Sequence, residues 1–155
     1  MWHDHKDSRA VYVDLRRERH VVDKGTPGTL GRRDIVIAPD VVADFTNLPF
    51  TDETFCHVVF DPPHHTSKRM GSGPSHIAAR YGRLFGGWEV TLAEGFKECF
   101  RVLKRGGTLI FKWGSVEIPL KQVLALTDVK PLYGHRSGRA AKTHWVAFIK
   151  PLHVE

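Results

Sequence analysis

Short apolar stretches alternate with longer amphipathic stretches along the chain, and this pattern predicts an α/β fold. The apolar stretches are too short for helices and end at proline, glycine or charged residues, which is typical of buried strands. We predict strands at residues 10–15, 34–39, 41–44, 58–60, 108–113, 130–133 and 143–150. Apolar residues recur at helical spacing over residues 88–103, and a shorter amphipathic helix is expected over residues 118–126.

The longer predicted helix has one apolar face and a clear end. The face comprises Val90, Leu92, Ala93, Phe96, Phe100 and Leu103. Lys104 and Arg105 suit the negative end of a helix dipole, and Gly106 with Gly107 is expected to terminate the helix. The strand at residues 108–113 follows these glycines directly.

Together these elements favour a single domain, residues 1–155, with a Rossmann-like, mostly parallel sheet and flanking helices. A chain of 155 residues, 41% of them hydrophobic, can bury one core. No apolar run approaches the length of a membrane span and no secretory signal is visible, so we expect no membrane partner and a cytoplasmic location. Cys56 and Cys99 form no Cys-x-x-Cys pair and are expected to be reduced and buried.

The net charge of +6 points to a polyanionic partner, nucleic acid first, although an ordinary basic surface has the same composition. Residues 65–87 contain no acid and several glycines, which is typical of a flexible lid over a polyanion or of a solvated loop. Residues 134–142 form a second basic segment, a turn or a solvated hairpin. The cationic candidates for substrate binding in these segments are Lys68, Arg69, Arg80, Arg83, Arg136 and Arg139.

One predicted strand ends in a distinctive corner. Residues 58–60 are followed by Asp61, Pro62, Pro63 and His64. The prolines stop the strand and stiffen its exit, because proline fixes φ and removes a backbone donor. The carboxylate of Asp61 is therefore held at the carboxyl end of a strand, where open α/β sheets bind their ligands.

Polar residues also follow two other predicted strands. Asp14 ends the strand at residues 10–15, where it can accept hydrogen bonds from ribose hydroxyl groups or act as a turn residue. Lys112 and Trp113 finish the strand at residues 108–113. They can contact a substrate phosphate and base, or they can be a packed aromatic residue beside a lysine that extends towards solvent.

The Asp61-Pro62-Pro63-His64 corner resembles the Asp-Pro-Pro-aromatic motif of class I S-adenosylmethionine-dependent methyltransferases that modify exocyclic amino groups, mainly N6 of adenine and also N4 of cytosine. Two flanking segments strengthen the resemblance, which extends over residues 10–150. An acid, Asp44, precedes a Leu-Pro-Phe turn at residues 48–50, and the helix–Gly–strand unit follows the corner in the same order as in that family.

The resemblance implies S-adenosylmethionine as cofactor and DNA or RNA as substrate. It implies that the cofactor is bound by Asp14, Asp44, Phe45, Phe60 and Asp61, where an acid accepts from the adenine amino group and Phe45 packs on the ring. It assigns the catalytic corner to Asp61, Pro62, Pro63 and His64. The substrate is expected to be contacted by Lys112, Trp113 and the six cationic residues named above.

The mechanism implied by the resemblance is direct methyl transfer. Asp61 and the carbonyl group of Pro62 accept hydrogen bonds from the target amino group and stabilise positive charge on its nitrogen. The proton then leaves to Asp61 or water, and a duplex substrate needs its target base flipped out. His64 replaces the aromatic residue that stacks on the base, and because histidine titrates near neutral pH we expect activity to fall in mild acid.

The sequence departs from the family pattern at its start. The usual first strand and glycine-rich loop have no counterpart, because Gly25, Gly28 and Gly31 have the wrong spacing and fit a surface loop or hairpin. We therefore expect a minimal, amino-terminally trimmed form, completed by its N-terminal segment or by a second subunit in a homo-oligomer. His3 and His5 lack a clustered third ligand, so no metal site is predicted.

Two other functions remain compatible with the sequence. One is a methyltransferase that acts on a small molecule or a protein, because the Leu-Pro-Phe segment also occurs in such enzymes. The other is a catalytically inactive nucleic-acid-binding module, which would fit the missing glycine-rich loop.

Overall fold

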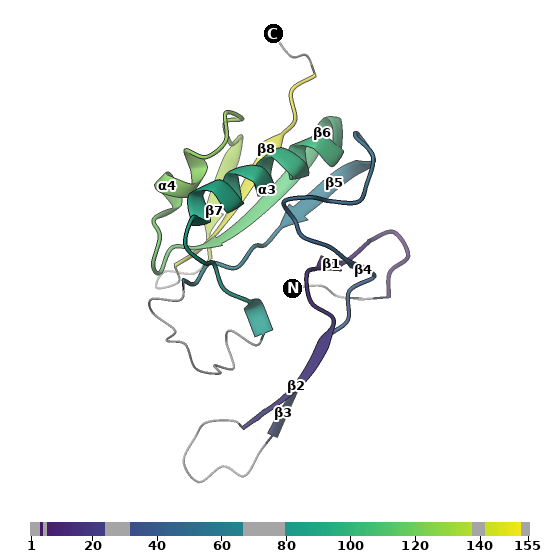
Figure 1. Ribbon diagram of the computed structural model, residues 1–155. Helices are drawn as coiled ribbons and strands as arrows, with labels where there is room; N and C mark the ends of the chain where they lie inside the picture. Colours follow the sequence, from purple (N-terminus) through teal and green to yellow (C-terminus); the bar gives the residue numbers. More distant parts are fainter. Residues whose placement is uncertain (1–3, 5, 24–31, 67–79, 138–141, 153–155) are drawn as a thin grey trace. The chain divides into compact units, whose positions relative to one another are not determined.

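The computed structural model describes residues 4, 6–23, 32–66, 80–137 and 142–152 (Figure 1). The chain forms two compact units, Met1–Phe45 and Thr46–Glu155. Each unit has its own sheet structure and is described by itself below.

The first unit contains a short parallel pair and a hairpin. Strand β1 (Val13–Asp14) pairs in parallel with β4 (Val41–Val42), so both predicted strands exist but are shorter than expected. Strands β2 (Glu18–Asp23) and β3 (Arg32–Ile37) form an antiparallel hairpin, which confirms the hairpin alternative for this glycine-rich region. The loop that joins β2 to β3 lies outside the described residues.

The second unit contains a four-stranded sheet in the order β5-β6-β8-β7. Its strands are β5 (Phe55–Phe60), β6 (Leu103–Gly114), β8 (Thr143–Ile149) and β7 (Tyr133–Arg136). Strands β5 and β6 are parallel, and β8 runs antiparallel to both of its neighbours. Three of these four strands therefore share one direction, which confirms the Rossmann-like, mostly parallel sheet.

The main helix α3 (Trp88–Val102) lies across one face of this sheet (Figure 1). Phe96 from α3 contacts Phe60 of β5, Phe111 of β6 and Phe148 of β8, with ring centroids 4.9 to 6.1 Å apart. These rings form the centre of the hydrophobic core. Val90 was predicted on the buried face but is 69% exposed, because it lies in the first turn of α3.

The two glycines after α3 have a different role from the predicted one. The helix already ends at Val102, and Leu103 has an extended backbone that begins β6. Gly106 has φ of 73°, and a Cβ atom at Gly107 would lie 2.9 Å from the carbonyl oxygen of Cys56. The glycines therefore permit a bulge that brings β6 into register with β5, rather than terminating the helix.

Alternation along β6 assigns its side chains to two faces. Leu109, Phe111 and Trp113 are fully buried on the face that packs against α3. The Nε1 atom of Trp113 donates a hydrogen bond to the carbonyl oxygen of Ile118, 2.9 Å away, just before the short helix α4 (Leu120–Leu124). Lys112 lies between buried neighbours and therefore projects from the opposite face.

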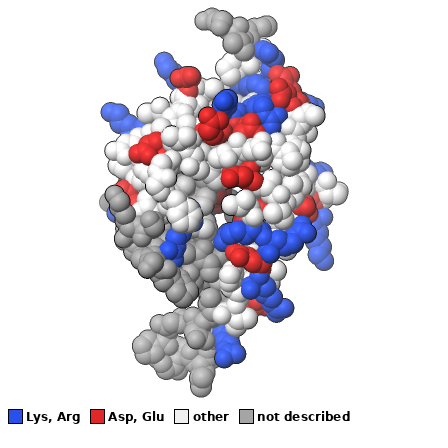
Figure 2. Space-filling view, viewed as in Figure 1, with Lys and Arg blue, Asp and Glu red and all other residues white. Residues whose placement is uncertain are grey.

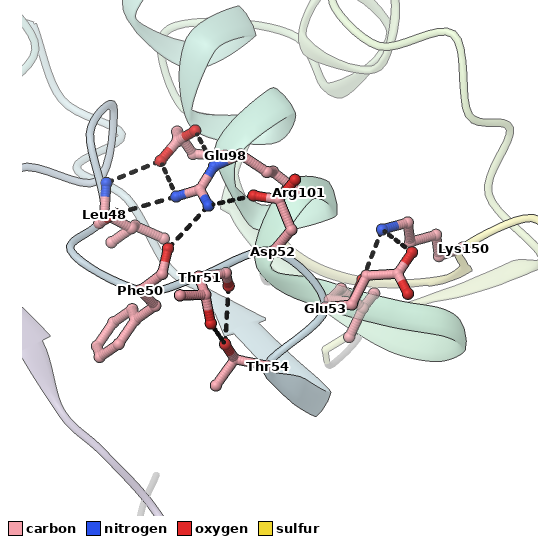
Figure 3. A network of polar contacts seen from close by, with 10 residues as sticks. Leu48, Phe50, Thr51, Asp52, Glu53, Thr54, Glu98, Arg101 and Lys150 are labelled. Carbon is pink, nitrogen blue, oxygen red and sulfur yellow. Dashed lines mark hydrogen bonds and ion pairs between the residues drawn. The ribbon is translucent and has the colours of Figure 1, made fainter.

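A cluster around Arg101 fastens the Leu-Pro-Phe turn to α3 (Figure 3). The guanidinium group of Arg101 donates to the carboxylate of Glu98 at 2.7 and 2.8 Å, and to the carbonyl oxygens of Leu48 and Phe50 at 3.0 and 2.8 Å. It also donates to Asp52 at 2.8 Å. The hydrogen bonds between Arg101 and Glu98 lower the pKa of Glu98 and raise the pKa of Arg101, so both groups stay charged.

The two cysteines are free and differ in exposure. Cys99 is buried in α3 as expected, but Cys56 is exposed, so the expectation of burial is wrong for it. Cys56 lies where the register between β5 and β6 shifts, and the sheet does not cover it there. Among the described residues, no helix is long and apolar enough to cross a membrane.

Candidate active site

The Asp-Pro-Pro corner begins at the carboxyl end of β5. Strand β5 ends at Phe60, whose ring is buried in the core, so the chain leaves the sheet at Asp61. Pro62 is buried and anchors the corner, whereas Asp61 as a whole residue is exposed. The side chain of Asp61 is only 24% exposed, so the exposed part of this residue is mainly its backbone.

Lys112 of β6 holds the carboxylate of Asp61. The Nζ atom of Lys112 lies 2.7 Å from Oδ2 of Asp61, and the Lys112 side chain is 19% exposed. Phe60 of β5 is the register partner of Phe111 of β6. Asp61 and Lys112 follow these two residues, so their side chains lie together on the opposite face from the two phenylalanine rings. Within the part of the chain that the structure describes, Oδ1 of Asp61 accepts no hydrogen bond.

A row of side chains continues from this pair across the sheet. Lys112 is the register partner of Trp145 in β8, which in turn is the partner of His135 in β7. The Nζ atom of Lys112 lies 5.8 Å from the centroid of the Trp145 ring, close enough for a cation–π contact. Trp145 therefore helps to position Lys112, a role for which its sequence context gave no signal.

A second carboxylate fixes the chain just beyond the corner. Glu117 accepts hydrogen bonds from the backbone N–H of Thr66 at 2.9 Å and from the Thr66 hydroxyl at 2.7 Å, both on Oε2. Its Oε1 pairs with Nδ1 of His65 at 2.9 Å. The Glu117 side chain is 10% exposed, and although this burial raises its pKa, the hydrogen bonds from Thr66 and His65 lower it overall.

Sequence reasoning missed Glu117, because a single acid in a turn carries no motif. Its position in the chain is the one feature that could have indicated it: Glu117 follows β6, which runs parallel to β5, and therefore lies at the same end of the sheet as the corner. Residues at this edge meet regardless of their separation along the chain. Glu117 thus acts on the corner through His65 and Thr66.

His64 lies against β6 instead of projecting freely. A Cβ atom at Gly114 would lie 2.7 Å from Cδ2 of His64, and the ring is edge-on to Trp113 at 5.9 Å. Its Nδ1 atom is buried and has no hydrogen-bond partner among the described residues, although the nearby carbonyl group of Pro62 acts to raise the pKa of His64. Burial, followed by the neighbouring His65, lowers the pKa of His64, so its protonation needs more acid than expected.

Two side chains that we expected to contact a ligand are buried. Trp113 is fully buried with its indole N–H satisfied, so it is the packed aromatic residue of the two alternatives and not a surface for a base. Phe60 is 5% exposed and packs between Phe96 and Phe111, so its ring is committed to the core rather than to a cofactor.

The predicted cofactor residues of the first unit have mixed environments. Asp14 accepts hydrogen bonds from the backbone N–H and the Nε atom of Arg16 at 2.9 and 3.1 Å, which is the geometry of the turn alternative. Asp44 is exposed and Phe45 is half-buried, and both follow β4.

The predicted basic contacts are only partly described. Arg80 and Arg136 are exposed and Arg83 is half-buried, whereas Lys68, Arg69 and Arg139 lie outside the described residues. Acidic and basic side chains are interspersed on the face shown in Figure 2. His3 and His5 also lie outside the described residues, and among the residues described no three His, Cys, Asp or Glu side chains are placed to hold a metal ion.

No protein-family model matches the sequence. No curated protein matches it either. Among solved structures, the chain is similar to the PH0226 protein from Pyrococcus horikoshii, at 16% identity and a TM-score of 0.50 over 73% of this chain and 59% of that chain.

Two crystal structures of TTHA0409 from Thermus thermophilus, described as a candidate DNA modification methylase, match at 19% and 18% identity with TM-scores of 0.45 and 0.46. They cover 69% and 73% of this chain and 49% and 54% of theirs, and this likeness is too slight to carry an argument. The chain thus spans about half to three-fifths of the length of these proteins. The match to PH0226 shows that the chain has an α/β fold like that of the PH0226 protein.

Proposed function

We propose that this protein is an S-adenosylmethionine-dependent methyltransferase that acts on an exocyclic amino group, N6 of adenine in DNA or RNA. One observation supports this most: a carboxylate and a proline carbonyl leave the sheet together at the carboxyl end of a parallel strand, with Oδ1 of Asp61 unbonded within the described residues. Ligands of open α/β sheets bind at this edge.

The corner suits an amino group as methyl acceptor. An exocyclic amine has two N–H donors and a lone pair that is delocalised into its ring. In this proposal Oδ1 of Asp61 accepts one hydrogen bond and the carbonyl oxygen of Pro62 accepts the other, which fixes the nitrogen and stabilises its growing positive charge. The amine proton then leaves to Oδ1 or to water.

Lys112 has a positioning role in this proposal. Its ammonium group donates a hydrogen bond to Oδ2 at 2.7 Å and thereby holds the carboxylate of Asp61 in one orientation. Because Oδ2 is engaged, the remaining oxygen is the one that faces the substrate. Glu117 stabilises the next residues of the corner through Thr66 and His65.

The residues present fit a cofactor in part. Asp44 is an exposed acid after a parallel strand and fits an adenine amino group, with the half-buried Phe45 as an apolar neighbour. The carboxylate of Asp14 accepts hydrogen bonds from Arg16 within a turn. When bound, S-adenosylmethionine supplies the methyl group as a sulfonium, and the chain's own part is to hold and deprotonate the acceptor.

A methyl-transfer assay with tritiated S-adenosylmethionine tests the proposal. The acceptors are plasmid DNA, bulk RNA, free adenosine and small amines, each with wild-type protein and with Asp61→Asn. The matched control is Asp128→Asn. Asp128 precedes β7, which is the edge strand on the other side of the sheet from β5.

We expect label in N6-methyladenine of DNA or RNA with wild type and Asp128→Asn, and at least about a hundredfold less with Asp61→Asn. Transfer only to small amines would favour the small-molecule alternative. Nucleic-acid binding without transfer to any acceptor would contradict the proposal and favour the inactive binding module.

A further inference from the structure

The segment that leads into α3 exposes two aromatic rings. Phe85 is 73% exposed and Tyr81 is 46% exposed. They lie four positions apart in residues 80–87, directly before α3 (Figure 1). Neither ring belongs to the core or to the polar contacts of the Asp-Pro-Pro corner.

The backbone of this segment is held in a defined conformation. Leu84 is 3% exposed and anchors the segment, while Gly82 and Gly87 adopt φ of 72° and 82° on either side of it. These left-handed positions turn the chain sharply and favour glycine. The exposure of Phe85 is therefore a consequence of a fixed backbone that buries its neighbour Leu84.

The anchor joins this segment to the candidate active site. The backbone N–H of Leu84 donates to the carbonyl oxygen of His65 at 2.8 Å, and Leu84 bridges Thr66 in parallel. His65 and Thr66 are the residues that Glu117 holds. Phe85 thus follows a residue that is bonded directly to the chain leaving the Asp-Pro-Pro corner.

The segment that carries the two rings contains two arginines and no acid. Arg80 lies over the Tyr81 ring, 5.3 Å from its centroid, and Arg83 falls between the two aromatic residues. No aspartate or glutamate occurs between Asp61 and Glu89 in the sequence. Exposed aromatic rings interleaved with arginines are the pattern by which proteins bind single-stranded nucleic acid, through base stacking and phosphate contacts.

We propose that Tyr81 and Phe85 form a stacking platform for unpaired bases, and that the substrate is single-stranded nucleic acid. This inference deepens the proposed function and rests on it for the identity of the reaction. Phe85 stacks on a base near the target, and the arginines contact the backbone phosphates. Because the segment is positively charged, a polyanion fits it better than an apolar protein surface does.

Fluorescence anisotropy with a short labelled oligonucleotide tests the platform without a cofactor. The probes are the single strand, its duplex, and an abasic single strand that keeps the phosphates but lacks bases. The variants are Phe85→Ala and the conservative Phe85→Trp. The matched control is Val90→Ala, since Val90 is 69% exposed on the neighbouring helix but is not aromatic.

We expect Phe85→Ala to weaken single-strand binding about tenfold, with an unchanged dependence of affinity on salt, because a base contact is lost and phosphate contacts remain. Phe85→Trp and Val90→Ala should bind like wild type. On the abasic strand, Phe85→Ala should bind like wild type, because no base is left to stack on. The duplex should bind more weakly than the single strand, because its bases are already paired and stacked.

Equal losses on the normal and abasic strands would overturn the platform, as would unchanged affinity of Phe85→Ala. Loss of self-association on light scattering with unchanged oligonucleotide binding would also overturn it, and would show that Phe85 is a contact between copies of the chain. If binding is as expected but neither the wild-type protein nor any variant transfers methyl groups, the result supports the stacking platform and contradicts the proposed function.

Discussion

The two ends of β5 use similar polar groups in different ways. Before the strand, Arg101 binds Glu98 and Asp52 and the carbonyl oxygens of Leu48 and Phe50 (Figure 3). After the strand, Lys112 is the one hydrogen-bond partner of Asp61 among the described residues, and Oδ1 of Asp61 accepts no hydrogen bond from them. The first end is saturated with contacts, and the second retains an acceptor.

This difference separates a structural cluster from a candidate chemical site. Polar groups that are fully satisfied within the protein contribute to stability and have nothing left to offer a ligand. An acceptor that stays available beside a fixed partner can bind a ligand without rearrangement. Variants of the amino end should therefore lose stability, and variants of the carboxyl end should lose activity.

The largest effect on stability is expected at the amino end. Arg101→Ala leaves the carbonyl oxygens of Leu48 and Phe50 without this donor. It also removes the charged partner of Glu98, whose side chain is 12% exposed and which keeps the backbone N–H of Leu48 as a donor. We expect a loss of about 2 to 4 kcal/mol in the free energy of unfolding, measured by urea denaturation. The control Lys97→Ala removes an exposed pair with Glu94 on the same helix and should cost under about 0.5 kcal/mol. Equal losses for the two variants would contradict the saturated cluster.

The next effect is expected on activity at Lys112. Lys112→Met removes the partner of Asp61 and frees its carboxylate to rotate. We expect methyl transfer to fall about tenfold, with a change of under about 1 kcal/mol in unfolding free energy. Lys112→Arg keeps the charge and should recover part of the rate. Full activity of Lys112→Met would show that the pair does not position Asp61.

Glu117 should affect both quantities to an intermediate degree. Glu117→Gln places an amide nitrogen against either His65 or the N–H of Thr66 and should cost about 1 to 2 kcal/mol of unfolding free energy at neutral pH. The pKa of Glu117 is lowered in the folded state, so its contribution is present above the unfolded value of 4.5 and is lost as pH falls through the folded value. Thermal melts from pH 7 to pH 3 should therefore converge for the two proteins. A constant difference at all pH values would contradict this role.

His64 should give the smallest effect. Burial, then the nearby His65, lowers its pKa, so below pH 6.5 the unfolded chain takes up a proton more readily than the folded one. The unfolding free energy of wild type should therefore decline from pH 7 to pH 5 more steeply than that of His64→Phe. Because the pKa of His64 is lowered, the expected fall in activity is shifted to lower pH. Parallel stability profiles would exclude His64 as the titrating group.

Sequence patterns were sufficient for the elements around the site. The apolar periodicity of residues 88–103 predicted α3, and the double proline after Asp61 predicted a strand end. Both signals are local, because periodicity and proline geometry depend on neighbouring residues only. The parallel order of β5 and β6 followed from the helix between them.

The pairing of side chains could not be predicted, because it depends on register between distant segments. Lys112 contacts Asp61 because the register places Phe111 beside Phe60. Trp113 is buried because alternation along β6 places it on the same face as Phe111. Glu117 meets Thr66 through a turn that has no periodic pattern. Cys56 is exposed at a register shift between β5 and β6, and no local sequence pattern predicts this shift.

The most direct test measures activity and stability on one preparation of Asp61→Asn. Methyl transfer to an adenine-containing oligonucleotide and the free energy of unfolding are determined in parallel with wild type. We expect a rate lower by about a hundredfold or more, with an unfolding free energy within about 1 kcal/mol of wild type. Retained transfer in a folded Asp61→Asn protein would contradict the assignment of the corner as the chemical site.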